Sequence, residues 1–409
     1  MLTFETWKKA DIFRKVLLFG IALFTFCINF HTSYSFQIFG VFALCCLFYF
    51  FKKREFFSPP FFYILMAIYF IYNAISIFWS SDTGFGLQKM GVYALYLLIP
   101  LIFSAFRLTK QEIDMILLIF IRAMFFFLFV SLCSCILQSR FMQISSAQWF
   151  NMHGIAFFNY DDVHKVITNR DILFAWLFRQ HETYYSFAYI FAFFLSIYYF
   201  LRRKTENRIN IVDFIFGLIL VILYSVFSHA RIALVFIILA MALGFGYKLL
   251  NHKKLLVVLS VACAVAGTVC VIIFWDKFIF FISDGTRPTL FQIAWENICQ
   301  RPFFGAGLGG LKQIFTTAHS SAGIDINFTT IFHPHNQFLA DWMQTGIFGL
   351  AIMLFIVIYT FYYAIKQRDF LIFVFMLMWL QMLLIESPMI SERGVFYFVL
   401  PMCILMQRK

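Results

Sequence analysis

Long apolar stretches separated by short polar connections follow one another from about residue 13 to the end of the chain. Each holds about 17 to 25 residues, enough for a helix to cross a hydrocarbon core of roughly 30 Å. Such stretches must be helices, because only a helix or a closed barrel satisfies every backbone polar group inside a bilayer. We therefore expect an all-α, polytopic membrane bundle forming one domain over 1–409, with about twelve spans: 13–31, 35–51, 60–79, 88–106, 113–138, 183–201, 211–228, 232–250, 255–275, 340–365, 370–386 and 394–407.

Positive charge collects on one side of this predicted topology. With the N-terminus in the cytoplasm, the cytoplasmic segments hold 20 of the 32 Lys and Arg residues, whereas the short outer connections hold only Lys89, Arg231 and Arg393. This asymmetry obeys the positive-inside rule and predicts an inner-membrane protein with both termini in the cytoplasm. Arg122 falls inside a predicted span, which indicates either an interfacial helix before a later start of that span or a polar cavity.

Two outer segments, 139–182 and 276–339, are much longer than the other connections. Both keep aromatic and charged residues instead of becoming rich in Ser and Gly, so we expect them to be folded. The second precedes the tenth span, and we expect it to be a partly helical periplasmic loop that carries the active site.

Composition narrows the class of protein. Apolar residues make up 62% of the chain and charged residues 13%, roughly half the charged share of a soluble domain. The net charge of +12 does not indicate nucleic-acid binding, because the basic residues cluster between apolar stretches and form no basic stripe with exposed aromatics. Of the nine cysteines only Cys299 falls in a connection, so neither a disulfide framework nor a metal site is predicted. No cleavable signal peptide is evident.

A candidate catalytic motif ends the second long segment, where the run His333 to Gln337 leads into an apolar helix containing Gly346 and Gly349. A helix N-terminus carries unpaired amide donors and a positive dipole end. His335 would stand there as a neutral imidazole able to take a proton from a hydroxyl, and Asn336 beside it could bind substrate. The two glycines would let a neighbouring helix approach closely. Alternatively, the histidines are ordinary interfacial residues before a helix start.

Two arginines on the outer side are candidates for binding a phosphate group. Arg287 precedes a glycine-rich stretch, 305–310, and Arg231 lies in a very short outer turn. Arg offers a fixed fork of donors that matches phosphate oxygens, and glycines permit close approach of backbone to a ligand. The stretch follows no predicted strand, which excludes a dinucleotide or P-loop site. Arg231 could instead snorkel to lipid headgroups.

Further polar residues gather near the outer end of the sixth span. Arg179, His181 and Tyr184 lie within seven positions and could shape a sugar or acceptor site, or equally belong to an aromatic belt. The segment 79–82 is better explained as architecture. The cluster 161–165 lacks convincing metal spacing and is better explained as a solvated loop.

Taken in order, these motifs resemble the O-antigen ligase and O-antigen polymerase superfamily of bacterial envelopes. The resemblance covers the predicted spans and the outer-turn Arg231, passes through Arg287, Trp295, Pro302 and Gly305, and ends at His335 with the later glycines. It implies a metal-independent, cofactor-free inverting glycosyltransferase acting at the periplasmic face on an undecaprenyl-diphosphate-linked glycan. By matching position, Arg231 and Arg287 would hold the diphosphate and His335 would activate or position the acceptor hydroxyl.

The acceptor and the class of activity stay open at this point. A ligase would use a sugar of lipid A-core, and a polymerase would use another lipid-linked repeat unit; the His-Asn spacing favours a ligase. A flippase or transporter of lipid-linked glycans would also have about twelve spans, but transporters place ionisable groups in the middle of the membrane. Here the Arg and His candidates share one face, which favours the enzyme. The sequence does not determine the sugar or the oligomeric state.

Overall fold

In the computed structural model the described residues are 10–28, 32–53, 59–141, 182–201, 209, 211–227, 286–321 and 333–408. The regular elements among them are all helices, without a strand. Six helices of this part of the chain are long and apolar enough to cross a membrane: Phe36–Lys53, Phe61–Trp79, Thr83–Ser104, Lys110–Val130, Tyr184–Leu201 and Gln337–Lys366. Ile211–Leu223 and Phe370–Ile385 are apolar but shorter.

The predicted polytopic helical fold is confirmed at this coarse level. Each predicted span that falls on described residues coincides with a helix, although several helices are too short to count as spans on length alone. The predicted spans 232–250 and 255–275 lie outside the described residues. Twelve spans and the orientation of the termini therefore stay predictions.

The chain divides into two compact units. The first comprises Met1–Phe57, Ile102–Lys248 and Ile404–Lys409, and the second comprises Ser58–Leu101 and Leu249–Cys403. Helices α6 (Leu95–Ser104) and α20 (Glu392–Met406) each contribute residues to both units. Both helices contain a proline, Pro100 and Pro401 respectively, which removes one backbone hydrogen bond from each.

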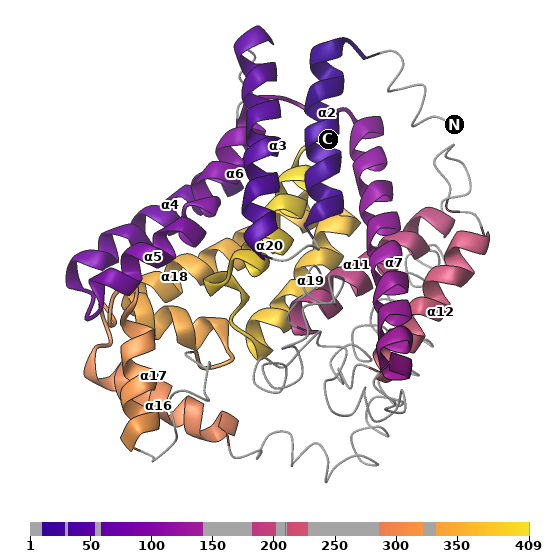
Figure 1. Cartoon of the computed structure of the whole chain (residues 1–409). Helices are drawn as coiled ribbons and strands as arrows, with labels where there is room; N and C mark the ends of the chain where they lie inside the picture. Colours follow the sequence, from indigo (N-terminus) through magenta and orange to yellow (C-terminus); the bar gives the residue numbers. More distant parts are fainter. Residues whose placement is uncertain are drawn as a thin grey trace, which may run out of the picture. The chain divides into compact units, whose positions relative to one another are not determined.

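The described part of the first unit holds five helices: the first two pack against each other, and the other three pack together (Figure 1). Its helices are α2 (Ile12–Cys27), α3 (Thr32–Lys53), α7 (Lys110–Phe141), α11 (Glu182–Leu201) and α12 (Ile211–Phe227). Helices α2 and α3 pack closely because Gly20 faces Cys45, where an added Cβ would lie 2.7 Å from the Cys45 Cβ. The rings of Phe24 and Phe42 stack across the same interface with centroids 5.3 Å apart. The α2–α3 interface thus combines a small-residue contact with aromatic packing.

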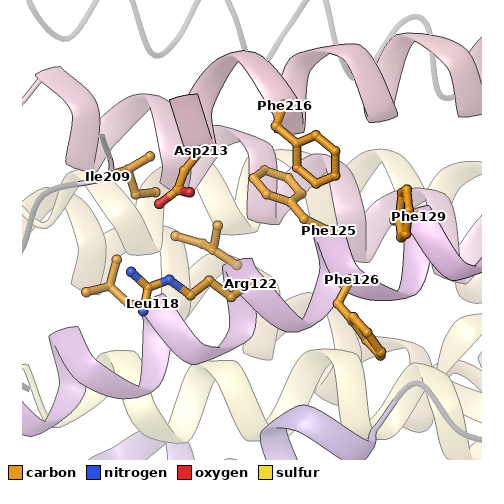
Figure 2. Close-up of a pocket in the computed structure, with 9 residues that line it drawn as sticks. Leu118, Arg122, Phe125, Phe126, Phe129, Ile209, Asp213 and Phe216 are labelled. Carbon is orange, nitrogen blue, oxygen red and sulfur yellow. The ribbon is translucent and has the colours of Figure 1, made fainter. Parts of the chain in front are cut away.

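Arg122, the charged residue inside a predicted span, lines a cavity of about 240 Å³ between α7 and α12. Asp213, in the first turn of α12, faces the same cavity, and four phenylalanines complete its wall (Figure 2). Arg122 is itself exposed, and Asp213 lines the same cavity from the other helix. An opposite charge nearby lowers the free-energy cost of placing a guanidinium within an apolar helix.

The second unit carries the candidate site on a long, broken helix. Its helices are α4 (Phe61–Ile75), η1 (Ser76–Trp79), α5 (Thr83–Tyr93), α16 (Thr286–Gln300), α17 (Gly310–Ser321), α18 (Gln337–Lys366), α19 (Phe370–Ile385) and η3 (Pro388–Ile390). Helix α18 packs against α4, α16, α17 and α19 and is therefore the central element of the unit (Figure 1). Its continuity is interrupted at Gly346, whose φ of 71° is not helical.

Apolar burial fixes α16 and α17 against the first part of α18. The buried cluster consists of Leu290, Ala294, Ile298, Leu311, Phe315, Ala340 and Met343. Trp295 and Trp342 meet edge to face beside it, with ring centroids 6.0 Å apart. Because Leu290 is three residues after Arg287, the start of α16 is anchored one turn away from that arginine. The described part of the segment 276–339 thus includes two helices, and its place on the periplasmic side stays a prediction.

Candidate active site

The side chain of His335 is bound to a carboxylate that lies far away in the sequence. Its Nδ1 atom is 2.9 Å from Oε1 and 3.0 Å from Oε2 of Glu386, which follows the last residue of α19. Glu386 is 3% exposed and His335 is 18% exposed, so the carboxylate is buried behind an accessible imidazole. An ionised carboxylate only accepts hydrogen bonds, so Nδ1 is the donor here and Nε2 keeps a free lone pair. A histidine held in this way is suited to act as a general base.

The backbone around His335 is held in an unusual conformation. His335 has a φ of 49°, in the left-handed region that non-glycine residues adopt at some cost. Asn336 then caps α18: its side-chain oxygen accepts from the Leu339 amide at 3.0 Å, and its Nδ2 donates to the Leu384 carbonyl at 3.0 Å. The predicted helix start after the His-Asn pair is therefore confirmed. It also ties α18 to the end of α19.

Gln337 makes the second connection between α18 and the α19–α20 turn. Its side-chain oxygen accepts from the Met389 amide at 2.8 Å, and the Met389 carbonyl in turn accepts from the Tyr96 hydroxyl at 2.5 Å. Because Gln337 is fully buried, these bonds are shielded from competing water. The turn that carries Glu386 is thus held in register with the turn that carries His335.

A buried polar network connects the first part of α18 to α4 and α5. Asp341 accepts from the Tyr69 hydroxyl at 2.7 Å and from Gln337 Nε2 at 3.1 Å, while its Oδ2 atom has no partner among the described residues. Gln344 donates to Asn73 Oδ1 and to the Tyr93 hydroxyl, each at 2.8 Å. Such directional bonds fix how α4 and α5 are aligned along α18, which apolar packing alone specifies less well.

The backbone of the glycine-rich stretch binds α18. Ala306 and Gly307 donate backbone hydrogen bonds to the carbonyls of Met343 and Gln344, both at 2.8 Å. Opposite them, Gly346 leaves room for the Phe303 carbonyl, which an added Cβ would overlap. Close backbone approach was expected here, and it occurs, but the approaching group is the broken helix. Gly349, by contrast, makes room for Thr345 of its own helix.

The same turn also engages η1, which confirms the architectural explanation of segment 79–82. Trp79 Nε1 donates to the Phe304 carbonyl at 2.8 Å, and the Ser80 hydroxyl donates to the Leu308 carbonyl at 2.6 Å. Asp82 caps α5 by accepting from the Phe85 amide at 2.9 Å. Most polar groups of the segment thus hold the fold together.

His333 adds a third group next to the His335–Glu386 pair. Its Nδ1 atom lies 3.5 Å from Glu386 Oε1 and accepts from the His335 amide at 3.3 Å. The two imidazole rings meet at a centroid distance of 4.4 Å. These three side chains form a group whose ligand atoms all lie within 4.8 Å of one another. The sequence predicted no metal site, and the donor set nevertheless suits one.

A surface hollow lies beside the turn between α16 and α17. It has a volume of about 760 Å³. Its lining includes Trp79, Arg301, Phe303 and Phe304, and Phe303 and Phe304 are well exposed. Exposed aromatic rings beside a guanidinium suit the apolar faces and hydroxyl groups of sugars.

The other predicted site residues are placed only in part. Arg287 lies in the first turn of α16, whereas Arg231, Arg179 and His181 lie outside the described residues. Tyr184 is buried at the start of α11 in the first unit. The structure thus brings together His335 and Asn336 and adds Glu386.

Glu386 was missed by reasoning from the sequence. It is the last residue of a predicted span, where it gave no pattern with a histidine 51 positions earlier. The available signal was a single acidic residue at the outer end of an apolar stretch, followed by Ser387 and Pro388. Such a carboxylate needs a partner when it is buried.

Comparison with known proteins supports the family resemblance inferred from the sequence. A family model described as O-antigen ligase matches residues 216–354, a segment that includes α16, α17, His335 and the break in α18. Glu386 lies beyond the matched segment. No curated protein matches the chain significantly. The match supports the resemblance of the segment 216–354 to the O-antigen ligase and polymerase superfamily.

Proposed function

We propose that this protein is a periplasmic-face glycosyltransferase that moves a glycan from an undecaprenyl-diphosphate donor to an acceptor hydroxyl, in the manner of an O-antigen ligase. The observation that carries this proposal is the His335–Glu386 pair at the capped start of α18. It supplies a histidine with a free Nε2 in the segment that the O-antigen ligase family model matches. The partners would be the lipid-linked donor, a lipid A-core or other glycan acceptor, and the surrounding lipids.

In the proposed reaction His335 Nε2 takes the proton of the acceptor hydroxyl while its oxygen attacks the anomeric carbon. The bond from that carbon to the diphosphate oxygen breaks, and its electron pair leaves with the diphosphate. Buried Glu386 stabilises the imidazolium that forms and holds the ring in orientation, as the carboxylate does in a catalytic triad. Attack opposite to the leaving group gives inversion at the anomeric carbon.

Arg231 and Arg287 are proposed to hold the leaving diphosphate. Guanidinium groups offer paired donors to phosphate oxygens, and positive charge there stabilises the negative charge that grows on the leaving group. The anchoring of α16 against α18 supports this role for Arg287, because both elements start in the same packed region. With cationic side chains in this role, the proposed reaction needs no metal ion.

The decisive test is transfer by purified protein from a defined polyprenyl-diphosphate glycan. His335→Ala, Arg287→Ala and Arg231→Ala should each abolish transfer while the protein still inserts, and Lys at either arginine position should rescue little. Arg107→Ala, which changes an exposed arginine outside the proposed site, is the matched control and should retain activity. Full activity of Arg287→Ala, or complete loss of wild-type activity with EDTA, would contradict the mechanism.

The same assay separates the ligase from the polymerase. Supplying either lipid A-core or a second lipid-linked repeat unit as acceptor shows which one is used. A deletion strain gives an independent answer, since loss of a polymerase leaves single repeat units on lipid A-core. Loss of a ligase leaves none and lets lipid-linked polymer accumulate.

A further inference from the structure

Three groups that can bind a transition metal converge at the start of α18. His333 and His335 offer neutral imidazole nitrogens and Glu386 offers a carboxylate oxygen. Two histidines and one carboxylate are a common ligand set for Zn²⁺ and for other divalent first-row transition ions. The two imidazoles are 19% and 18% exposed, so an ion from solution can reach them.

The spacing of the three groups matches the requirements of such an ion. With bonds of about 2.0–2.1 Å in tetrahedral geometry, neighbouring ligand atoms stand about 3.3 Å apart. In the structure His335 Nδ1 is 2.9 Å from Glu386 Oε1, and His333 Nδ1 is 3.5 Å from the same oxygen. These two spacings are close to that value and all three ligand atoms lie within 4.8 Å of one another, so side-chain rotations that release His333 Nδ1 from the His335 amide would let the group enclose an ion.

The backbone already holds the two histidines toward the carboxylate. Pro334 fixes its own φ between them, His335 adopts the left-handed conformation, and Asn336 caps the helix that follows. The cap also ties α18 to Leu384, two residues before Glu386. Preorganised ligands lose little freedom when they bind an ion, which favours tight binding.

We propose that His333, His335 and Glu386 form an inhibitory site for a divalent first-row transition metal ion, for which Zn²⁺ is the probe. The inhibitory effect rests on the proposed function, because it assumes that His335 is the base. Metal binding itself depends only on the three side chains.

Inhibition follows from the tautomer that a bound ion imposes on His335. With Glu386 as its partner, His335 carries its proton on Nδ1 and has a basic Nε2. When Zn²⁺ occupies Nδ1, the neutral ring carries its proton on Nε2, which can no longer accept one from a hydroxyl. The ion also takes up the Glu386 carboxylate that would stabilise the imidazolium. A bound ion thus removes both parts of the base at once.

Binding is tested first, without any glycan substrate. Purified full-length protein in detergent is titrated with Co²⁺ and followed by its visible absorption, and Zn²⁺ is then added as a competitor. We expect saturable binding of one ion, weakened at least tenfold in His333→Ala, in line with the loss of one ligand. Cys299→Ser is the matched control, because Cys299 is an exposed free thiol that could bind metal independently. Its affinity for Co²⁺ should equal that of the wild type.

Inhibition is then measured in the transfer assay, with each variant compared with its own rate in EDTA. Zn²⁺ should inhibit the wild type reversibly, and the inhibitory concentration should rise at least tenfold in His333→Ala but not in Cys299→Ser. Unchanged binding in His333→Ala would overturn the metal site. Activity that is lost in EDTA and restored by Zn²⁺ would overturn the inhibitory role and the metal-free mechanism together. A wild type that binds Co²⁺ as expected but transfers no glycan would contradict the proposed function alone.

Discussion

His335 Nδ1 lies 2.9 Å and 3.0 Å from the two carboxylate oxygens of Glu386, a residue 51 positions later in the chain. The bond joins the turn before α18 to the turn after α19, and both turns are held by further hydrogen bonds through Asn336 and Gln337. The candidate base is therefore positioned by two helix ends, so its geometry depends on residues of both α18 and α19.

The first prediction concerns Glu386. Glu386→Gln should preserve the shape of the site but remove the negative charge that stabilises the imidazolium. We expect kcat to fall about 10²- to 10⁴-fold, by analogy with the triad carboxylate, with little change in KM. Steady-state transfer kinetics measure this split. A rise in KM as large as the fall in kcat, or a variant with wild-type activity, would show that Glu386 does not act through His335.

The second prediction concerns the break in α18. Gly346→Ala places a Cβ on the Phe303 carbonyl at a φ of 71°, so both overlap and backbone strain oppose the native structure. We expect a loss of about 2–4 kcal/mol in the free energy of unfolding. Gly91→Ala is the control, because no atom lies within 4 Å of an added Cβ at that helical position. Thermal unfolding in detergent should show a drop for the first variant and none for the second.

The third prediction concerns the buried Asp341. Tyr69→Phe removes the hydroxyl that donates to Asp341 at 2.7 Å and leaves the Gln337 side chain as a donor to Asp341. The expected cost is about 1–3 kcal/mol, the penalty for an under-satisfied buried acceptor. Tyr359→Phe alters a half-buried hydroxyl on α18 and should cost less than about 0.5 kcal/mol. Equal stability of the two variants, measured by chemical denaturation, would show that this network carries little energy.

The fourth prediction concerns the first unit, where Arg14 forms a paired contact with Glu112. Arg14 Nε donates to Oε1 at 2.7 Å and Nη2 donates to Oε2 at 2.5 Å, joining α2 to α7. Glu112→Ala leaves a partly buried guanidinium without this carboxylate and should cost about 3 kcal/mol. Lys53→Ala breaks an ion pair with Asp11 in which both side chains are well exposed and screened by water, and should cost much less than Glu112→Ala. Thermal unfolding of both variants tests the difference.

Reasoning from the sequence predicted the helices well because membrane spans are determined by length and hydrophobicity, which are local properties. Helix α4 and the predicted span 60–79 agree closely, and the start of α18 follows the His-Asn pair as expected. The break at Gly346 was not foreseen, since glycine is common in membrane helices and signals no break by itself. Its cause lies in the Phe303 backbone, 43 residues earlier in the chain.

Prediction of the candidate site succeeded for residues that share a motif and failed for the residue that does not. His335 and Asn336 stand together in the sequence, so their link to a helix start could be recognised. Glu386 comes from another helix end, and nothing local to it indicates a histidine partner. The glycine-rich stretch was correctly recognised as a place of close approach, although its partner proved to be the protein's own helix.

The contact between the glycine-rich turn and α18 is made by main-chain atoms on both sides, so it does not depend on which side chains surround it. The rings of Phe303 and Phe304 are exposed and make none of these main-chain bonds, so exchanging either ring should leave the contact between the turn and α18 in place.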